Sequence, residues 1–161
     1  MNSKVLFQRG IIGQKVYGAG VLKNHALTFN VVGIPFLEPS FASVEESRSH
    51  SVHGVVISLD YISYLRLCAT EAVPVYYIPK EVEIEMYSGE TVNAFTLQAA
   101  NGPFRFPNSL KIPPSDAYLK VIREGAREAG LKEEYCNFLE SIPPNSMVFE
   151  SNWRSKLRQN R

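Results

Sequence analysis

The stretch LCATEAVPVYY, residues 67–77, places one carboxylate, Glu71, among small and apolar side chains. Between Asp60 and Lys80 the only other charged side chain is that of Arg66. Charged groups are rarely buried without a partner, so this glutamate has two explanations. Either the loop turns outward and Glu71 reaches water, or an apolar pocket raises its pKa so that the carboxyl can move protons near neutral pH.

Other residues whose side chains could bind a metal, hold a phosphate or act as nucleophiles form weaker patterns. His50 and His53 are three residues apart, but no nearby ligand set completes a metal site, so we expect no metal. The glycine-rich stretch YGAG, residues 17–20, reads as a turn and lacks the Lys-Ser/Thr of a phosphate loop. Cys68 and Cys136 lie far apart, so we expect two reduced, packed thiols and no disulfide framework. An enzyme with this sequence would act without metal or cofactor, through a single positioned carboxyl.

The elements next to Glu71 follow from apolar patterning. The nearly continuous apolar run VHGVVISL, residues 52–59, predicts a strand that is buried on both faces. Asp60 can cap a helix that follows this strand, and Glu71 falls just past the end of that helix. The buried side of the helix is expected to consist of Ile62, Leu65 and Ala69.

The clearest strand is KEVEIEMY, residues 80–87, in which apolar residues alternate with glutamates. A period of two places the apolar set in the core and the glutamates in water, so the acidic row is not a site. The turn at residues 88–90 leads into TVNAFTL and completes a hairpin. An earlier strand is predicted over residues 26–32, before the turn-rich segment 33–40. The apolar set is Val82, Ile84 and Met86, and the acidic set is Glu81, Glu83 and Glu85.

Helices dominate the end of the chain. A long helix begins at Ser115 and is expected to stop at Gly130, and a second spans residues 131–142 before two prolines. A short helical piece is predicted at residues 3–9. The expected buried positions of the two long helices are Tyr118, Val121, Ile122, Gly125, Ala126 and Ala129, then Tyr135, Phe138, Leu139 and Ile142. Strands followed by helices indicate an α+β fold.

The 161 residues suggest one domain over residues 1–144 and a basic tail over residues 145–161. The net charge of +1 disfavours nucleic acid or an anionic membrane as partner. No apolar run approaches the roughly 20 residues of a membrane-spanning helix, and we recognise no signal peptide. These features predict a cytoplasmic enzyme or binding domain.

Four blocks in order, residues 21–47, 51–60, 69–86 and 113–135, resemble the gamma-glutamylcyclotransferases. The resemblance implies a small mixed β-barrel with α-helices packed outside, no cofactor and a possible homodimer. It also implies cleavage of a small gamma-glutamyl substrate to 5-oxoproline and a free amine, with Glu71 as the catalytic acid/base. Tyr118 and Tyr77 match tyrosines at the substrate, and the alternatives are a core role for Tyr118 and Tyr76 as the competing register. Phe95 stands where some relatives carry a tyrosine.

This chemistry needs a carboxyl with a raised pKa, and the apolar setting of Glu71 would provide it. The desolvation is expected from Ala69, Ala72, Val73 and Val75. The chain departs from the family at its front, where MNSKVLFQRG resembles the segment after the family's Tyr-Gly-Ser loop. The first strand and that loop are missing from the pattern. The sequence therefore leaves three hypotheses open: a shortened cyclotransferase, a non-catalytic binding member of the fold, or a cyclotransferase for gamma-glutamylamines or glutathione.

Overall fold

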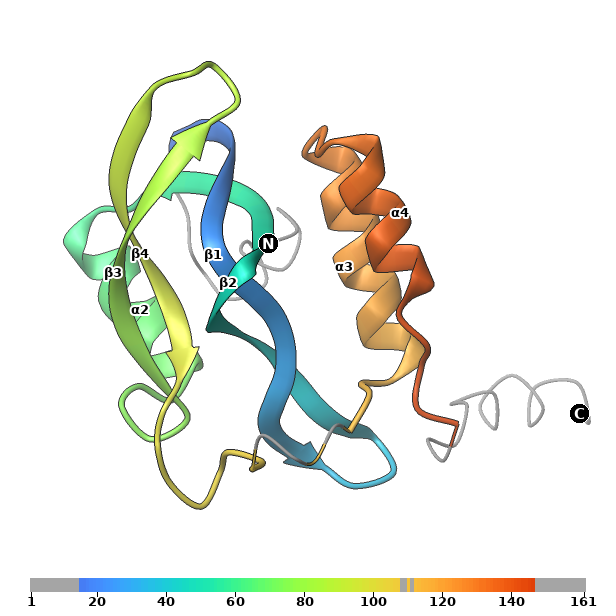
Figure 1. Ribbon diagram of the computed structural model, residues 1–161. Helices are drawn as coiled ribbons and strands as arrows, with labels where there is room; N and C mark the ends of the chain where they lie inside the picture. Colours follow the sequence, from blue (N-terminus) through green and yellow to red (C-terminus); the bar gives the residue numbers. More distant parts are fainter. Residues whose placement is uncertain (1–14, 108–109, 111, 147–161) are drawn as a thin grey trace, which may run out of the picture.

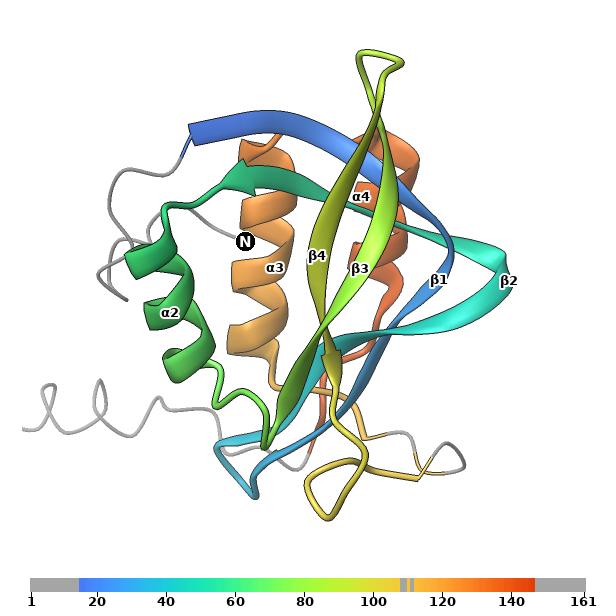
Figure 2. The same ribbon diagram turned by 90° about the vertical axis from the view of Figure 1, so that its left-hand side faces the viewer.

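The structure is a computed structural model that describes residues 15–107, 110 and 112–146. The described residues form a sheet of four strands in the order β2-β1-β3-β4, and each pair of neighbouring strands is antiparallel (Figure 1). The strands are β1 (Lys15–Ile34), β2 (Glu38–Ser58), β3 (Tyr77–Met86) and β4 (Thr91–Ala99). The helices are α2 (Tyr61–Thr70), α3 (Asp116–Glu128) and α4 (Glu133–Ser141). Helices α3 and α4 lie side by side on one side of the sheet, apart from α2 (Figures 1 and 2).

The first hairpin is much longer than the sequence pattern indicates. The predicted strand at residues 26–32 is the middle of β1, and irregularities in register let its pairing with β2 continue along nearly the whole length of both strands. The prediction of a turn at residues 17–20 is wrong, because these residues lie within β1. A Cβ atom at Gly20 would lie 2.5 Å from Ile84 Cγ2. The glycine is therefore needed where β1 passes close to β3, not for a turn.

The second hairpin confirms its prediction. Val82 and Met86 are buried, whereas the three glutamates of β3 are exposed. Glu85 forms an ion pair with Lys23 of β1. Val82 packs with Leu22 of β1 and Val44 of β2, and Ile84 lies against this cluster, so the sheet curls around its own apolar side.

The expectation of a closed, mixed barrel is not met by the described residues. All four strands run antiparallel, and β2 and β4 stand at the two ends of the sheet. These strands approach each other at one point, where the Ala99 N–H donates to Ser43 Oγ at 2.8 Å and Gln98 Nε2 donates to the Val44 carbonyl at 3.2 Å. Side-chain bonds replace a backbone ladder there, so the described sheet is curled and open.

Helix α3 begins and ends as its sequence predicts. Ser115 is the N-cap, and its Oγ accepts a hydrogen bond from the Tyr118 N–H at 3.0 Å. Gly130 has φ 64° and donates to the Arg127 carbonyl, while the Leu131 N–H donates to the Ala126 carbonyl, which completes a Schellman motif. The buried stripe shifts from its prediction, because Leu119 is fully buried and Val121 is exposed.

Helix α4 buries Tyr135 and Leu139 against α3 and the first hairpin, as expected, whereas Phe138 is largely exposed. Arg123 of α3 links that helix to the C-terminal end of α4. Its Nε donates to the Leu139 carbonyl at 3.1 Å and its Nη2 donates to the Ile142 carbonyl at 2.9 Å. The guanidinium thus satisfies the last carbonyl groups of α4.

Helix α2 follows Asp60, whose carboxylate accepts the Ser63 N–H at 2.8 Å, as predicted for an N-cap. Its buried side is not the predicted one. Ile62, Leu65 and Ala69 are exposed and Ser63 is buried. The strand over residues 52–59 also differs, because its residues are half-buried or exposed. Apolar residues occur on both sides of α2, so periodicity alone does not say which side meets the sheet.

The predictions for residues 3–9 and for the tail beyond residue 146 fall outside the described residues. Within the part of the chain that is described, no helix combines the length and apolar character that a membrane crossing requires.

Candidate functional site

Glu71 is the C-cap residue of α2, as its place after the predicted helix requires. Its N–H donates to the Leu67 carbonyl at 2.9 Å, and its side chain is half-buried. The apolar enclosure expected around it is partial. Ala72 and Val73 are half-buried, but Val75 is 55% exposed. Glu71 is therefore neither fully exposed to water nor fully enclosed by apolar side chains, which are the two alternatives that the sequence suggests.

The turn after Glu71 is a Schellman motif closed by an alanine. The Ala72 N–H donates to the Ala69 carbonyl at 3.1 Å, and the Val73 N–H donates to the Cys68 carbonyl at 2.9 Å. Ala72 has φ 50°, a region that costs a residue with a Cβ atom about 1–2 kcal/mol. Local backbone strain is frequent at functional sites. This strained residue directly follows Glu71. The sequence does not predict it, because glycine is the usual residue at this position of a Schellman motif.

The Ala72 carbonyl also holds the rest of this loop. It accepts the Val75 N–H at 2.7 Å and the Tyr76 N–H at 3.0 Å. Residues 72–76 are therefore a hydrogen-bonded connection between the end of α2 and the start of β3. This connection fixes the offset between Glu71 and Tyr77.

Tyr77 is the first residue of β3 and is only 8% exposed. Its hydroxyl donates to the Ala42 carbonyl of β2 at 2.9 Å, and its ring packs with Val31 and Ala99. Tyr76 differs from Tyr77, because its ring stacks on Phe104 with a centroid distance of 4.5 Å. Both tyrosines border the same apolar cluster, but it is Tyr77 whose hydroxyl is directed to β2.

Tyr118 lies in the first turn of α3. Its hydroxyl oxygen accepts the Ala42 N–H at 3.4 Å, and its ring meets Phe41 edge-on at 5.6 Å. The structure therefore brings together the hydroxyl groups of Tyr118 and Tyr77, which bind the N–H and the carbonyl of the same residue. Glu71 is connected to this pair through the hydrogen-bonded residues 72–76.

Glu38 holds α3 in place, a role that its sequence does not reveal. Its carboxylate accepts the Ser115 N–H at 2.8 Å and also the Ser115 hydroxyl. A carboxylate at a helix N-terminus interacts favourably with the helix dipole and with unsatisfied N–H groups. The start of β2 thereby sets the position of the turn that carries Tyr118.

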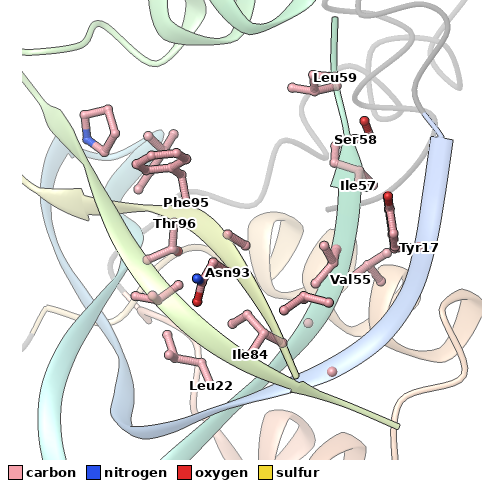
Figure 3. A pocket seen from close by; sticks show the side chains of 18 of the residues that line it. Tyr17, Leu22, Val55, Ile57, Ser58, Leu59, Ile84, Asn93, Phe95 and Thr96 are labelled. Atoms are coloured by element: carbon pink, nitrogen blue, oxygen red, sulfur yellow. The ribbon is translucent and has the colours of Figure 1, made fainter. Parts of the chain in front are cut away.

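A cavity of about 560 Å³ lies between β2 and β4, and Figure 3 shows side chains from both strands around it. Glu71, Tyr77 and Tyr118 are not among its lining residues, although Tyr64 and Leu67 of α2 are. Phe95 lies on the β4 wall and is 68% exposed. No acidic, basic or histidine side chain is among the described residues that line this cavity.

His53 belongs to a polar and aromatic cluster away from Glu71. Its Nδ1 lies 2.5 Å from the Tyr87 hydroxyl, and its ring stacks on Tyr135 at 4.5 Å. The Lys132 N–H donates to the Tyr87 hydroxyl at 3.1 Å. Burial lowers the pKa of His53, with the Lys132 charge acting in the same direction and Glu134 opposing it. Burial also raises the pKa of Tyr135 to about 12.

The remaining candidates from the sequence take no part in a visible site. His50 accepts or donates bonds with the hydroxyls of Ser47 and Ser49 and lies on the exposed part of β2. Among residues 15–146, where described, no group of three histidine, cysteine or acidic residues is arranged to hold a metal ion. Cys68 and Cys136 are free, half-buried thiols.

The AIG2-like family model matches residues 51–139. The gamma-glutamyl cyclotransferase gliK of Aspergillus fumigatus is 30% identical over 96% of this chain and 67% of its own length. A gamma-glutamylcyclotransferase of Bos taurus is 34% identical over 65% of this chain. The chain spans only 52% of the length of that bovine relative.

Solved structures show the same fold at lower sequence identity. A structure described as a gamma-glutamyl cyclotransferase superposes with a TM-score of 0.79 at 21% identity, covering 99% of this chain and 93% of its own. An uncharacterized protein from Homo sapiens superposes with a TM-score of 0.76 at 21% identity, covering 98% of this chain and 92% of its own. These comparisons confirm the resemblance found in the sequence. The chain belongs to the AIG2-like, gamma-glutamylcyclotransferase family.

Proposed function

We propose that this protein is a gamma-glutamyl cyclotransferase that converts a gamma-glutamyl amino acid or peptide to 5-oxoproline and a free amine. The proposal is supported by relatives at about 30% identity that carry this name. The observation on which it depends is the placement of Glu71. A half-buried carboxyl stands at the end of α2, in a hydrogen-bonded turn that leads directly to Tyr77.

Glu71 transfers the proton in the proposed reaction. The α-ammonium group of the substrate gives a proton to the Glu71 carboxylate, and the freed amine attacks the γ-carbonyl carbon of the same molecule. A carbon–nitrogen bond forms to close the five-membered ring, and the bond from that carbon to the departing nitrogen breaks. The departing nitrogen takes this proton back from Glu71, and the same carboxylate then passes it the second proton of the ring nitrogen, so that neutral 5-oxoproline forms, the amine leaves as an ammonium ion and no external reactant is needed. General acid–base catalysis of this kind contributes roughly 10²–10⁴-fold.

The fold supplies the rest of the barrier reduction by positioning. Because nucleophile and electrophile are in one molecule, holding the glutamyl chain in attack geometry can supply up to about 7–11 kcal/mol. We propose that Tyr77 and Tyr118 help to hold it, since their hydroxyl groups lie on the same residue of β2. Helix α3 is fixed through Ser115 and Glu38, which keeps Tyr118 in position.

The first experiment measures 5-oxoproline released from gamma-glutamyl-alanine by the wild-type chain and by Glu71→Gln. The amide keeps the size of the side chain and cannot accept the ammonium proton, so we expect at least a 100-fold loss of turnover. Glu83→Gln is the matched control, because Glu83 is exposed on β3 and is expected to leave turnover unchanged. Turnover by Glu71→Gln equal to that of the control would refute the role of Glu71.

The second candidate function is that of a non-catalytic binding member of the family. It is favoured by the 560 Å³ cavity, because the described residues that line it include no charged partner for the charged ends of a glutamyl group. Sustained turnover by the wild-type chain that is lost in Glu71→Gln would exclude this candidate. A folded wild-type chain without turnover would support it.

The substrate class is tested by comparing gamma-glutamyl-alanine, glutathione and a gamma-glutamyl-lysine isopeptide. The preferred compound is the one with the highest kcat/KM, because that ratio measures discrimination between substrates. The homodimer remains a prediction, and sedimentation velocity at several protein concentrations tests it.

A further inference from the structure

A short connection, residues 112–115, leads into α3, and one side of it is held by β2. Ser40 is fully buried and donates its hydroxyl to the Ile112 carbonyl at 2.6 Å. The Glu38 carboxylate accepts the Ser115 N–H at 2.8 Å, and it also accepts the hydroxyl of that serine. Because Glu38 and Ser40 are two residues apart, their side chains lie on the same side of β2.

The other side of this connection is held by Asn145, which follows α4. Its N–H donates to the Pro114 carbonyl at 2.8 Å, and its Nδ2 donates to the Pro113 carbonyl at 3.2 Å. Proline has no backbone N–H, so its carbonyl is the backbone group through which a hydrogen bond can hold it. Asn145 supplies a donor to both prolines of the connection.

Asn145 also makes the helix pair part of this arrangement. The connection runs into α3, α4 runs back beside that helix, and the chain then returns to the connection at Asn145 (Figure 1). Arg123 of α3 binds the Leu139 and Ile142 carbonyls at the end of α4, just before this return. The place of the connection therefore depends on β2 on one side and on the helix pair on the other.

The connection determines where Tyr118 lies, and Ser115 is the link between them. Ser115 is only 2% exposed, and its Oγ accepts the Tyr118 N–H at 3.0 Å. The bond between the Tyr118 hydroxyl and the Ala42 N–H is 3.4 Å long, and a bond of this length is too weak to fix the ring by itself. The place of the hydroxyl therefore depends on where the backbone at the start of α3 lies.

We propose that Asn145 is a positioning residue for Tyr118: its two hydrogen bonds hold residues 113–114 in place and so fix the position of the Tyr118 hydroxyl. This inference rests on the proposed function, in which Tyr118 helps to hold the glutamyl group. Asn145 acts through this tyrosine and does not itself contact the substrate. A residue outside the helices and strands thereby contributes to substrate recognition.

The first measurement follows Tyr118 directly, by fluorine NMR of the full chain with fluorotyrosine incorporated. Asn145→Asp keeps the size of the side chain, but a carboxylate cannot donate to the Pro113 carbonyl. Asn137→Asp is the matched control, because Asn137 is exposed on α4 and the change of charge is the same. The Tyr118 signal is identified by its loss in Tyr118→Phe. We expect Asn145→Asp to shift or broaden this signal and the control to leave it unchanged, and an unchanged signal in Asn145→Asp overturns the proposal.

The second measurement is a double-mutant cycle on the turnover of gamma-glutamyl-alanine. We expect Asn145→Asp to lower kcat/KM by roughly fivefold or more in the wild-type chain, but by less than about twofold in Tyr118→Phe, where the hydroxyl that it positions is absent. Equal losses in both backgrounds would show a structural effect that does not act through Tyr118, and they also overturn the proposal.

The two measurements separate this inference from the proposed function. A wild-type chain without turnover refutes the proposed function, whereas the fluorine signal still decides whether Asn145 places Tyr118. If circular dichroism shows that Asn145→Asp does not fold, Asn145→Ala replaces it and Asn137→Ala becomes the control. This variant removes the same donor without adding a charge, so the same outcomes support or overturn the proposal.

Discussion

The hydroxyl groups of Tyr77 and Tyr118 bind the two backbone polar groups of one residue, Ala42. Tyr77 donates to its carbonyl at 2.9 Å, and Tyr118 accepts from its N–H at 3.4 Å. The first distance is that of an ordinary hydrogen bond and the second is that of a weak one. Through this residue of β2, the start of β3 and the first turn of α3 are held together, although forty residues of sequence lie between the two tyrosines.

The difference between these two bonds leads to a stability prediction. Tyr77→Phe leaves the Ala42 carbonyl without this donor in a mostly buried place, and we expect a loss of about 1–2 kcal/mol in the free energy of unfolding. Tyr118→Phe should cost less than about 1 kcal/mol, because its bond is longer. Urea unfolding measures both, with Tyr61→Phe as an exposed control. A larger loss for Tyr118→Phe than for Tyr77→Phe would contradict this ranking.

The contact between β2 and β4 should also be measurable. Ser43 is 3% exposed, and its Oγ is the acceptor for the Ala99 N–H. Ser43→Ala leaves that N–H without its acceptor in the core, so we expect a loss of about 1–3 kcal/mol. Ser49→Ala, at an exposed position of the same strand, should change stability by less than about 0.5 kcal/mol. Equal urea midpoints for the two variants would show that the Ser43 bond does not stabilise the fold.

The turn at Ala72 predicts a stabilising substitution. Glycine removes the strain of about 1–2 kcal/mol at φ 50° and adds roughly 0.5–1 kcal/mol of backbone entropy to the unfolded chain. Ala72→Gly should therefore raise the free energy of unfolding by about 0.5–1 kcal/mol. Ala69→Gly, inside α2, is the opposite control and should lower it by a similar amount. If Ala72→Gly destabilises the protein, the strain is not released by the substitution.

Acidification should weaken the protein through His53. Its pKa is lowered in the folded state by burial first and then by Lys132, against the opposing charge of Glu134. The unfolded chain, with an ordinary value near 6.5, takes up the proton more readily. The stability contributed by neutral His53 is therefore complete above about pH 6.5 and is lost as pH falls through the lower, folded value.

Urea midpoints between pH 7.5 and 5.5 test this prediction. The midpoint of the wild-type chain should fall with pH more steeply than that of His53→Gln, which cannot titrate. His50→Gln is the control, because His50 is an exposed histidine of the same strand. The Tyr87 hydroxyl and the Tyr135 ring also face His53, and burial raises the pKa of Tyr135 to about 12, far above this range. Parallel pH profiles for the wild-type chain and His53→Gln would exclude His53 as the source.

Some parts of the fold were predictable because one physical signal dominates them. The alternation of Val82, Ile84 and Met86 identifies both β3 and its buried side, since a strand has a period of two. Ser115 and Gly130 identify the ends of α3, because each satisfies a specific need of a helix terminus. The position of Glu71 after α2 follows from the same kind of local signal.

Other parts depend on contacts between distant segments. The glycines of residues 17–20 suggest a turn locally, but Gly20 is required by the approach of Ile84. The long pairing of β1 with β2 includes polar residues that carry no strand signal, and it is maintained by register irregularities. The bond from Glu38 to Ser115 joins residues that only the folded chain brings together. The meeting of Tyr77 and Tyr118 at Ala42 has no local signal either.

The helix pair α3–α4 is attached to the rest of the fold at two places. One support is the bond from Glu38 to Ser115, and the other is the contact of Lys132 with Tyr87. Arg123 binds the last carbonyls of α4 and links the two helices. The Lys132 contact shares the Tyr87 hydroxyl with His53, whereas the Glu38 contact lies at the first turn of α3 with Tyr118. Protonation of His53 therefore acts on the attachment that is remote from Tyr118.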